Sequence, residues 1–248
     1  MKTPLLLLAV AVSCMAQQPT VWYELVYLKV LPANVDAFIK SQTVIQPVQQ
    51  DRVAKGQIVG WAYYSVRFAG TKSEYNYVRV TAYSDYARIG IINFTDEQLR
   101  RVTELQSGVV RNSLRDEVKT DVLGQYSSAG TLNAPWLLCS FIKSKPGMEQ
   151  DARADQTKLY KPLRDAQLKA GRRSQKGWAA ALVRWPTGAN VEYDLMTADA
   201  FDTFEAVNAP DNVGFEAQSA EAARIVATHK VTVKRELWQL IISTDPAK

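Results

Sequence analysis

An eight-residue pattern of hydrophobic and polar positions occurs twice along the chain. It reads Gly-Trp-Ala-x-x-x-Val-Arg, and it lies at residues 60–67 and again at residues 177–184. Apolar and aromatic residues dominate both copies, which is typical of a β-strand. Self-similarity of this kind indicates a duplicated structural unit.

Further matches lie on both sides of this pattern at nearly the same separation. The separation drifts from 114 to 118 residues along the chain, as small loop insertions would produce. Each unit is therefore about 110 residues long, within the usual range of a domain. The matched residues include Trp22 and Trp136, Lys29 and Lys143, Pro32 and Pro146, and Glu74 and Glu192.

Within each unit the periodicity predicts the order strand, helix, strand, strand, helix, strand. Apolar residues at three- and four-residue steps mark the first helix. A glycine follows each of these helices, where a C-terminal cap requires a positive φ. A proline in each helix should kink it or stand in the first turn of a restarted helix. The helices are expected at residues 33–55 and 147–170, with Pro47, Gly56, Pro162 and Gly171.

The second helix of each unit is predicted from a different signal in the two units. Thr95-Asp96-Glu97-Gln98 is a capping-box sequence that begins the second helix of the first unit. The corresponding helix of the second unit is expected at residues 215–228. Residues 127–134 have the small and polar composition of a linker. The strands outside the repeated hairpins are expected at residues 22–31, 118–126, 136–143 and 231–242.

Two tandem βαββαβ units resemble the ferredoxin-like dimeric α/β-barrel superfamily. Members include antibiotic-biosynthesis-type monooxygenases, NIPSNAP-like domains and haem-binding chlorite-dismutase-like proteins. The resemblance implies an α+β fold in which two sheets pack face to face within one chain, with a cavity between them. The units are expected at residues 17–126 and 135–248, joined by the linker at residues 127–134.

Residues 1–16 have the pattern of a signal peptide. Lys2 supplies the basic start, residues 5–12 form a short apolar core, and small residues precede Gln17. The apolar run is too short to span a bilayer as a helix. We therefore expect export to the periplasm or the extracellular space. The residues up to Cys14 also loosely resemble a lipoprotein processing box, which leaves a lipid anchor at Cys14 open.

Charge and composition argue against several classes of function. The net charge is +5, but basic and acidic residues are interspersed, so nucleic acid is not an expected partner. Cys139 is the one cysteine outside the signal, which excludes an intramolecular disulfide. His229 is the single histidine, which excludes a multi-histidine metal site. Nucleotide-binding and hydrolase motifs are missing from the sequence, so no metal or cofactor is expected.

Strand alternation divides the repeated strand into two faces. One face carries the tryptophan and the arginine, and the other carries small uncharged residues in both copies. Because a face packed under helices must be uncharged, we expect the Trp–Arg face to line the cavity. The tryptophans and the tyrosine would form its wall, and the arginines would hold an anion. The candidate ligand-binding residues are Trp61, Tyr63, Arg67, Trp178 and Arg184.

Two structural alternatives remain open for these residues. Each arginine could form a cross-strand ion pair at its hairpin, as Arg67–Glu74 and Arg184–Glu192. The tryptophans could simply fill the core between the sheets, since aromatic residues dominate core burial. In both cases the two tryptophans are expected to be buried within one chain.

The resemblance favours an exported small-molecule-binding protein whose ligand is small and apolar or aromatic. A cofactor-free, monooxygenase-like activity is left open, because a fold does not by itself fix a function. One alternative is a non-enzymatic structural or binding protein whose cavity is filled by its own side chains. Another is a haem-binding protein that uses His229 as its axial ligand. Further oligomerisation through other surfaces is also left open.

Overall fold

The computed structural model describes most of the chain after residue 20. The described residues are 21–70, 72–90, 94–107, 116–130, 134–171, 174–188, 190–208, 220, 224 and 227–244. The predicted signal peptide and most of the predicted helix at residues 215–228 therefore lie outside them. Within these ranges no helix combines the length and the apolar character that crossing a membrane requires.

Antiparallel strands close into a barrel in the order β1-β3-β2-β8-β5-β7-β6-β4. The first half of the chain and the second half each contribute four strands in the same spatial order. The halves are joined where β2 pairs with β8 and where β4 pairs with β6. The strands are β1 (Trp22–Lys29), β2 (Gly60–Arg67), β3 (Tyr77–Tyr83), β4 (Asp116–Gly130), β5 (Trp136–Ser144), β6 (Gln175–Trp185), β7 (Leu195–Phe201) and β8 (Lys230–Ser243).

Strand register places the repeated residues at equivalent positions in the two halves. In the first half, Trp61 of β2 pairs with Thr81 and Trp22 of β1 pairs with Tyr83, two residues further along β3. In the second half, Trp178 of β6 pairs with Asp199 and Trp136 of β5 pairs with Phe201, again two residues further along β7. We call two residues at such equivalent positions counterparts.

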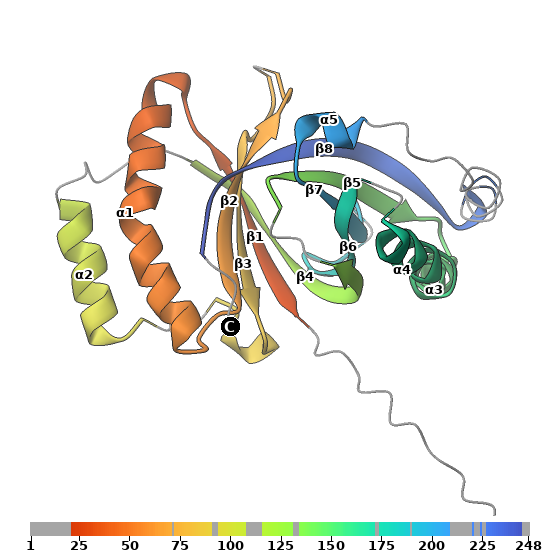
Figure 1. Ribbon diagram of the computed structural model, residues 1–248, viewed down its shortest axis with the longest axis horizontal. Coiled ribbons are helices and arrows are strands. Elements are labelled where there is room, and N and C mark those ends of the chain that lie inside the picture. The colour runs from red at the N-terminus through yellow and green to blue at the C-terminus, as the bar shows by residue number, and fades with distance from the viewer. Residues whose placement is uncertain are drawn as a thin grey trace, which may run out of the picture.

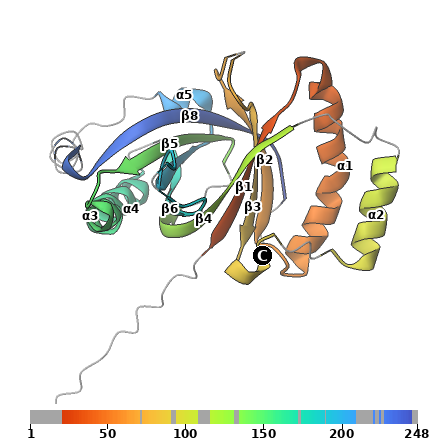
Figure 2. The same cartoon turned by 180° about the vertical axis from the view of Figure 1, so that it is seen from behind.

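Helices cover the outside of the barrel. The long helix α1 (Val35–Ala54) lies along the sheet of β1, β2 and β3, and α2 (Asp96–Ser107) packs on its far side (Figures 1 and 2). The second half carries α3 (Glu149–Asp155), a π-helical turn (Gln156–Tyr160) and α4 (Lys161–Ala170). A short helix, α5 (Phe204–Val207), contacts β5 and β7.

Three of the local helix signals are confirmed, whereas α1 continues through Pro47 without a restart. Pro162 lies in the first turn of α4, where its missing N–H costs no hydrogen bond, and α4 ends at Gly171 with φ 60°. The capping box is formed in both directions. The backbone N–H of Gln98 donates to Thr95 Oγ1 at 3.2 Å, and the backbone N–H of Thr95 donates to Gln98 Oε1 at 2.8 Å.

The linker prediction was wrong for residues 127–130, which belong to β4. Ser127 to Gly130 pair with Ala180 to Gly177 of β6. The small and polar residues that suggested a linker instead extend β4 across to the second half. The barrel can close only because β4 reaches β6, a pairing between distant segments that composition does not reveal.

Candidate functional site

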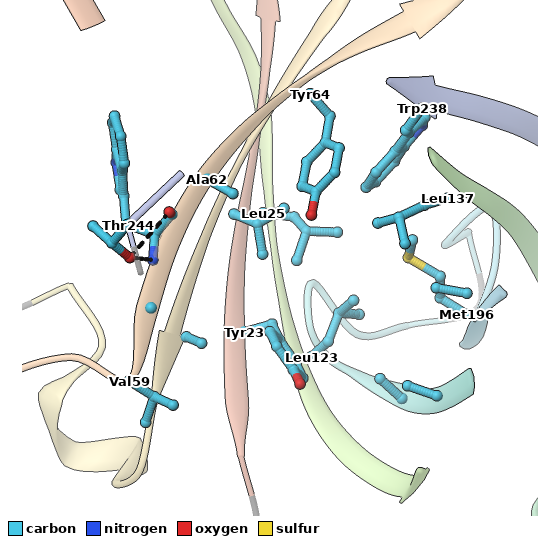
Figure 3. Close-up of a pocket in the computed structure, with 17 residues that line it drawn as sticks. Tyr23, Leu25, Val59, Ala62, Tyr64, Leu123, Leu137, Met196, Trp238 and Thr244 are labelled. Atoms are coloured by element: carbon cyan, nitrogen blue, oxygen red, sulfur yellow. Dashed lines mark hydrogen bonds between the residues drawn. The ribbon is translucent and has the colours of Figure 1, made fainter. Parts of the chain in front are cut away.

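A cavity of about 250 Å³ lies inside the barrel, and both halves contribute to its wall (Figure 3). Almost all of the wall is aliphatic or aromatic. The first half supplies Tyr23, Leu25, Trp61, Ala62, Tyr64, Val80 and Leu123, with Val59, Gly60 and Ala82 beside them. The second half supplies Leu137, Ala179, Ala181, Met196, Ala198, Trp238 and Thr244.

Part of the cavity's space comes from small residues in the second half. Ala181 is the counterpart of Tyr64, so the second half lacks a ring that the first half places in the barrel. Ala179 and Ala198 pair directly across β6 and β7 and also line the cavity. Because these three alanines carry no side chain beyond Cβ, the space in front of them stays open.

The predicted orientation of the repeated strand was wrong. Tyr63 packs edge-on against Phe38 of α1, with ring centroids 5.5 Å apart, and Trp61 packs on Tyr63 at 5.2 Å. Trp178 belongs to a separate cluster against which Tyr160 packs. The large rings therefore lie under the helices, and the alanine face looks inward. A closed eight-stranded barrel has an interior that side chains fill, and Tyr64 and Trp238 fill it beside these alanines.

Burial of the two tryptophans was nevertheless predicted correctly. Trp61 is 4% exposed and Trp178 is 2% exposed. Their cover is a layer of helices rather than the opposite sheet. Of the five candidate ligand-binding residues, Trp61 alone is part of the cavity wall.

The two candidate arginines lie outside the cavity lining. Arg67 is exposed, and its guanidinium carbon is 6.0 Å from the centre of the Phe68 ring. The guanidinium carbon of Arg184 is 5.8 Å from the centre of the Trp22 ring. Both arginines therefore pack against aromatic residues on the outside of the barrel.

Neither predicted hairpin ion pair is formed within the described ranges. Glu192, the expected partner of Arg184, lies 3.4 Å from Lys119 Nζ and 3.2 Å from Lys234 Nζ instead. These two lysines come from β4 and β8. The residue pattern of the hairpin does not indicate which distant strands lie beside it.

Two phenols are the main polar groups of the cavity. Burial raises the pKa of Tyr23 to about 12, and it raises the pKa of Tyr64 further above the usual range. Both side chains are therefore neutral at physiological pH and can act as hydrogen-bonding groups. The indole N–H of Trp238 donates to Glu236 Oε2 at 2.9 Å, outside the cavity lining.

A network of tyrosines, lysines and carboxylates fills the adjoining part of the barrel. Tyr193 donates its hydroxyl hydrogen bond to Asp121, and Tyr75 donates to Glu236. Tyr75 and Tyr193 are counterparts, as are Asp121 and Glu236, so each bond joins one half to the other. Burial, followed by the neighbouring carboxylates, raises the pKa of both tyrosines.

Lysines repeat the same symmetry. Lys119 Nζ lies 4.6 Å from the centre of the Tyr27 ring. Phe141 is the counterpart of Tyr27, and the centre of its ring lies 4.6 Å from Lys234 Nζ. Glu192 is shared by both lysines. Its partial burial raises its pKa, but the two lysines outweigh this effect and the pKa is lowered overall. We call this group of residues the tyrosine–lysine network. Because it packs one part of the interior, the cavity is confined to the apolar part.

His229 is not part of the cavity wall. Its Nδ1 lies 3.1 Å from Asp155 Oδ2, at the junction of β8 with α3. Among the residues that the structure describes, no group of three or more His, Cys, Asp or Glu side chains could hold a metal ion. Cys139 is fully buried in the core, and burial raises the pKa of its thiol.

No protein-family model matches the sequence, and no curated protein matches it. Solved structures do resemble the fold. A candidate monooxygenase from Lactobacillus acidophilus NCFM has a TM-score of 0.54 at 7% identity, over 91% of this chain and 96% of that one. An anthrone oxidase-like protein has a TM-score of 0.52 at 10% identity, over 93% and 94%. A candidate monooxygenase from Fusobacterium nucleatum has a TM-score of 0.51 at 8% identity, over 91% and 94%.

The chain has the dimeric α/β-barrel fold. The predicted resemblance is thus confirmed at the level of architecture. The dimeric α/β-barrel fold accounts for the position of the cavity, which lies where the strands of the two halves face each other. Identities of 7% to 10% carry no information on the ligand or the reaction.

Proposed function

We propose that this chain is a small-molecule-binding protein whose ligand, small and apolar or aromatic, occupies the barrel cavity. The observation that carries this proposal is the apolar cavity of about 250 Å³ that both halves of the barrel line. The cavity opens partly to solvent, so water contacts its apolar wall. An apolar ligand that displaced this water would gain the free energy of burying apolar surface.

We also infer that the two halves are tandem ferredoxin-like βαββαβ units, at residues 17–126 and 135–248. Matching strand order and matching register support this inference. The repeated hydrogen bonds of Tyr75 and Tyr193 support it further, since each joins the two halves as an approximate two-fold axis requires. Superposition of residues 22–126 on residues 136–242 tests it, and a poor fit of β1–β4 on β5–β8 would contradict it.

The cavity lining supports binding better than turnover. Oxygenase chemistry without a cofactor needs a base that removes a proton from the substrate. Among the described residues of the lining, the ionisable side chains are Tyr23 and Tyr64, whose raised pKa values keep them protonated. The lining also contains no histidine, so the cavity itself offers haem no imidazole ligand.

Export is proposed from residues 1–16. The mass of the protein recovered from its own host should correspond to a chain that begins at Gln17. A chain that begins at Cys14 and carries added acyl mass would instead establish the lipid anchor. Recovery of the chain with Met1 still present would contradict export through this segment.

Filling the cavity tests the binding proposal. Ala181→Leu adds three carbon atoms to the wall, and we expect it to weaken the binding of 2-naphthol, a small aromatic probe, at least tenfold, which is about 1.4 kcal/mol. Binding is measured by quenching of tryptophan fluorescence, because Trp238 lines the cavity. Ala37→Leu, the same change at an exposed position of α1, is the control and should bind like the wild type. Equal affinity in both variants would contradict the proposed site.

A further inference from the structure

The hydroxyl of Tyr64 lies in the cavity without a hydrogen bond. The Tyr64 residue is 4% exposed, and its ring reaches from β2 into the cavity with the oxygen at the inner end (Figure 3). Among the described residues, none forms a hydrogen bond with this oxygen. Cys139 and Tyr23 lie near enough to affect the pKa of Tyr64, but neither accepts its proton. A buried polar group without a partner is uncommon and calls for an explanation.

A shift in strand register accompanies this position in both halves. The pairing of β2 with β8 shifts between Tyr63 and Tyr64. The pairing of β6 with β4 shifts at their counterparts, Ala180 and Ala181. Such bulges redirect side chains and are frequent next to active sites. Both Tyr64 and Ala181 line the cavity, so the fold presents the same position to the interior twice.

The fold does not need a hydroxyl at this position. Ala181 occupies it in the second half with a side chain that has no polar atom. In the first half, a phenylalanine would fill the same space as Tyr64 and could pack in the same way on Trp238, whose ring centre is 5.9 Å from that of Tyr64. Burying a hydroxyl without a partner costs free energy that a phenylalanine would not cost. Packing therefore explains the ring of Tyr64 but not its oxygen.

The other polar groups of the lining limit what a ligand can carry. Thr244 Oγ1 accepts a hydrogen bond from the Trp61 N–H at 3.0 Å and donates to the Trp61 carbonyl at 3.3 Å, so it is already engaged. Among the described residues of the lining, none has a charged side chain. A charged ligand would lose its hydration there without gaining an ion pair. The lining therefore favours a neutral ligand.

We propose that the cavity ligand is a neutral carbonyl compound, a ketone or an aldehyde, whose oxygen accepts a hydrogen bond from the Tyr64 hydroxyl; this rests on the binding function proposed above. A carbonyl group accepts hydrogen bonds and brings no donor that would itself need a buried partner. Burial raises the pKa of Tyr64, so its hydroxyl keeps the proton that it donates. A ligand that displaces water from a hydroxyl without replacing the hydrogen bond loses affinity. Tyr64 would thus select ligands by one oxygen atom.

Two ligands of nearly the same shape test the proposal. Acetophenone carries the carbonyl oxygen, and α-methylstyrene has a CH₂ group in its place. We expect Tyr64→Phe to weaken the binding of acetophenone at least fivefold in isothermal titration calorimetry, because the buried carbonyl loses its donor. The same variant should bind α-methylstyrene within twofold of the wild type. A structural role of Tyr64 would change the affinity for both ligands alike.

Tyr160→Phe is the matched control, since it removes the same atom from a tyrosine outside the cavity lining. It should bind both ligands like the wild type. Loss of acetophenone binding in Tyr23→Phe but not in Tyr64→Phe would overturn the role given to Tyr64. Benzoate, which presents a charged carboxylate instead of the ketone, should bind at least tenfold more weakly than acetophenone. Equal or tighter binding of benzoate would overturn the choice of a neutral ligand.

The outcomes separate the carbonyl proposal from the binding function on which it rests. If acetophenone and α-methylstyrene bind the wild type and Tyr64→Phe changes both affinities equally, the cavity binds small molecules but the carbonyl proposal is overturned. The same holds if 2-naphthol binds and acetophenone does not. If none of the three binds, the binding function is contradicted as well. Tyr64→Phe should fold at least as stably as the wild type, because it removes an unpaired buried hydroxyl.

Discussion

Lys230→Met is expected to stabilise the protein by on the order of 3 kcal/mol at pH 7. The Lys230 side chain is 4% exposed, its Nζ is buried without a hydrogen-bond partner, and its nearest carboxylate oxygen, on Asp155, is 4.0 Å away. Burial lowers the pKa of Lys230 from 10.5 to about 8, and the attraction of Asp155 only partly offsets this. The substitution therefore replaces a buried, weakly paired ammonium group with an apolar side chain of similar length.

The pH dependence distinguishes this cause from better packing. Below pH 8 the amine is charged in both the folded and the unfolded state, so the full cost is present. Between about pH 8 and pH 10.5 the folded state releases the proton and the unfolded state keeps it, so wild-type stability gains relative to the variant as pH rises. The advantage of Lys230→Met should therefore shrink across this window.

Urea unfolding of both proteins at pH 7, 8.5 and 10 measures the difference. Lys158→Met, at an exposed position of the π-helical turn, is the matched control and should change stability little at any pH. A difference between Lys230→Met and the wild type that stays constant from pH 7 to pH 10 would show that the charge of Lys230 is not its origin.

Tyr193→Phe should destabilise the protein by about 1.5–3 kcal/mol, the usual range for a hydrogen bond to a charged group. Asp121 is 3% exposed, and the Tyr193 hydroxyl is its hydrogen-bond donor. After the substitution, its remaining close partner within the described residues is Lys119, whose Nζ is 3.9 Å away. A buried carboxylate would then lack a hydrogen bond, which is costly in a low-dielectric interior.

The counterpart substitution is the control. Tyr75→Phe removes the equivalent bond to Glu236, but Glu236 keeps the N–H of Trp238 at 2.9 Å and the ammonium of Lys234 at 3.4 Å. We expect Tyr75→Phe to cost clearly less than Tyr193→Phe in the same unfolding experiment. Equal costs would mean that the loss of packing, rather than the unpaired carboxylate, determines the effect.

Much of the local structure could be predicted from the sequence because its causes are local. The capping box at Thr95 and Gln98, the cap at Gly171 and the restart at Pro162 depend on residues within one helical turn. Residue spacing also predicted that Trp61 and Trp178 occupy matching positions, and their cross-strand registers do match.

The candidate site was predicted only in part. Alternation with a period of two separates the faces of β2 and β6, but it does not say which face lies inside. Ala179 and Ala181 were interpreted as part of a surface beneath helices, although they line the cavity. The signal that pointed the other way was the size difference between Tyr64 and its counterpart Ala181, because a repeat that loses a ring leaves a space.

The sequence by itself predicted the order of the strands, the first helix of each half, and the helix signals at Thr95, Pro162 and Gly171. Tertiary structure alone decided which side chains meet in the barrel, because closure pairs β2 with β8 and β4 with β6. Those pairings bring Tyr193 to Asp121 and Tyr75 to Glu236, across 72 and 161 residues of chain. Closure also decides which face of each strand looks inward, because only one face of a closed sheet can meet the opposite strands, and it leaves Trp61 and Trp178 under the helices.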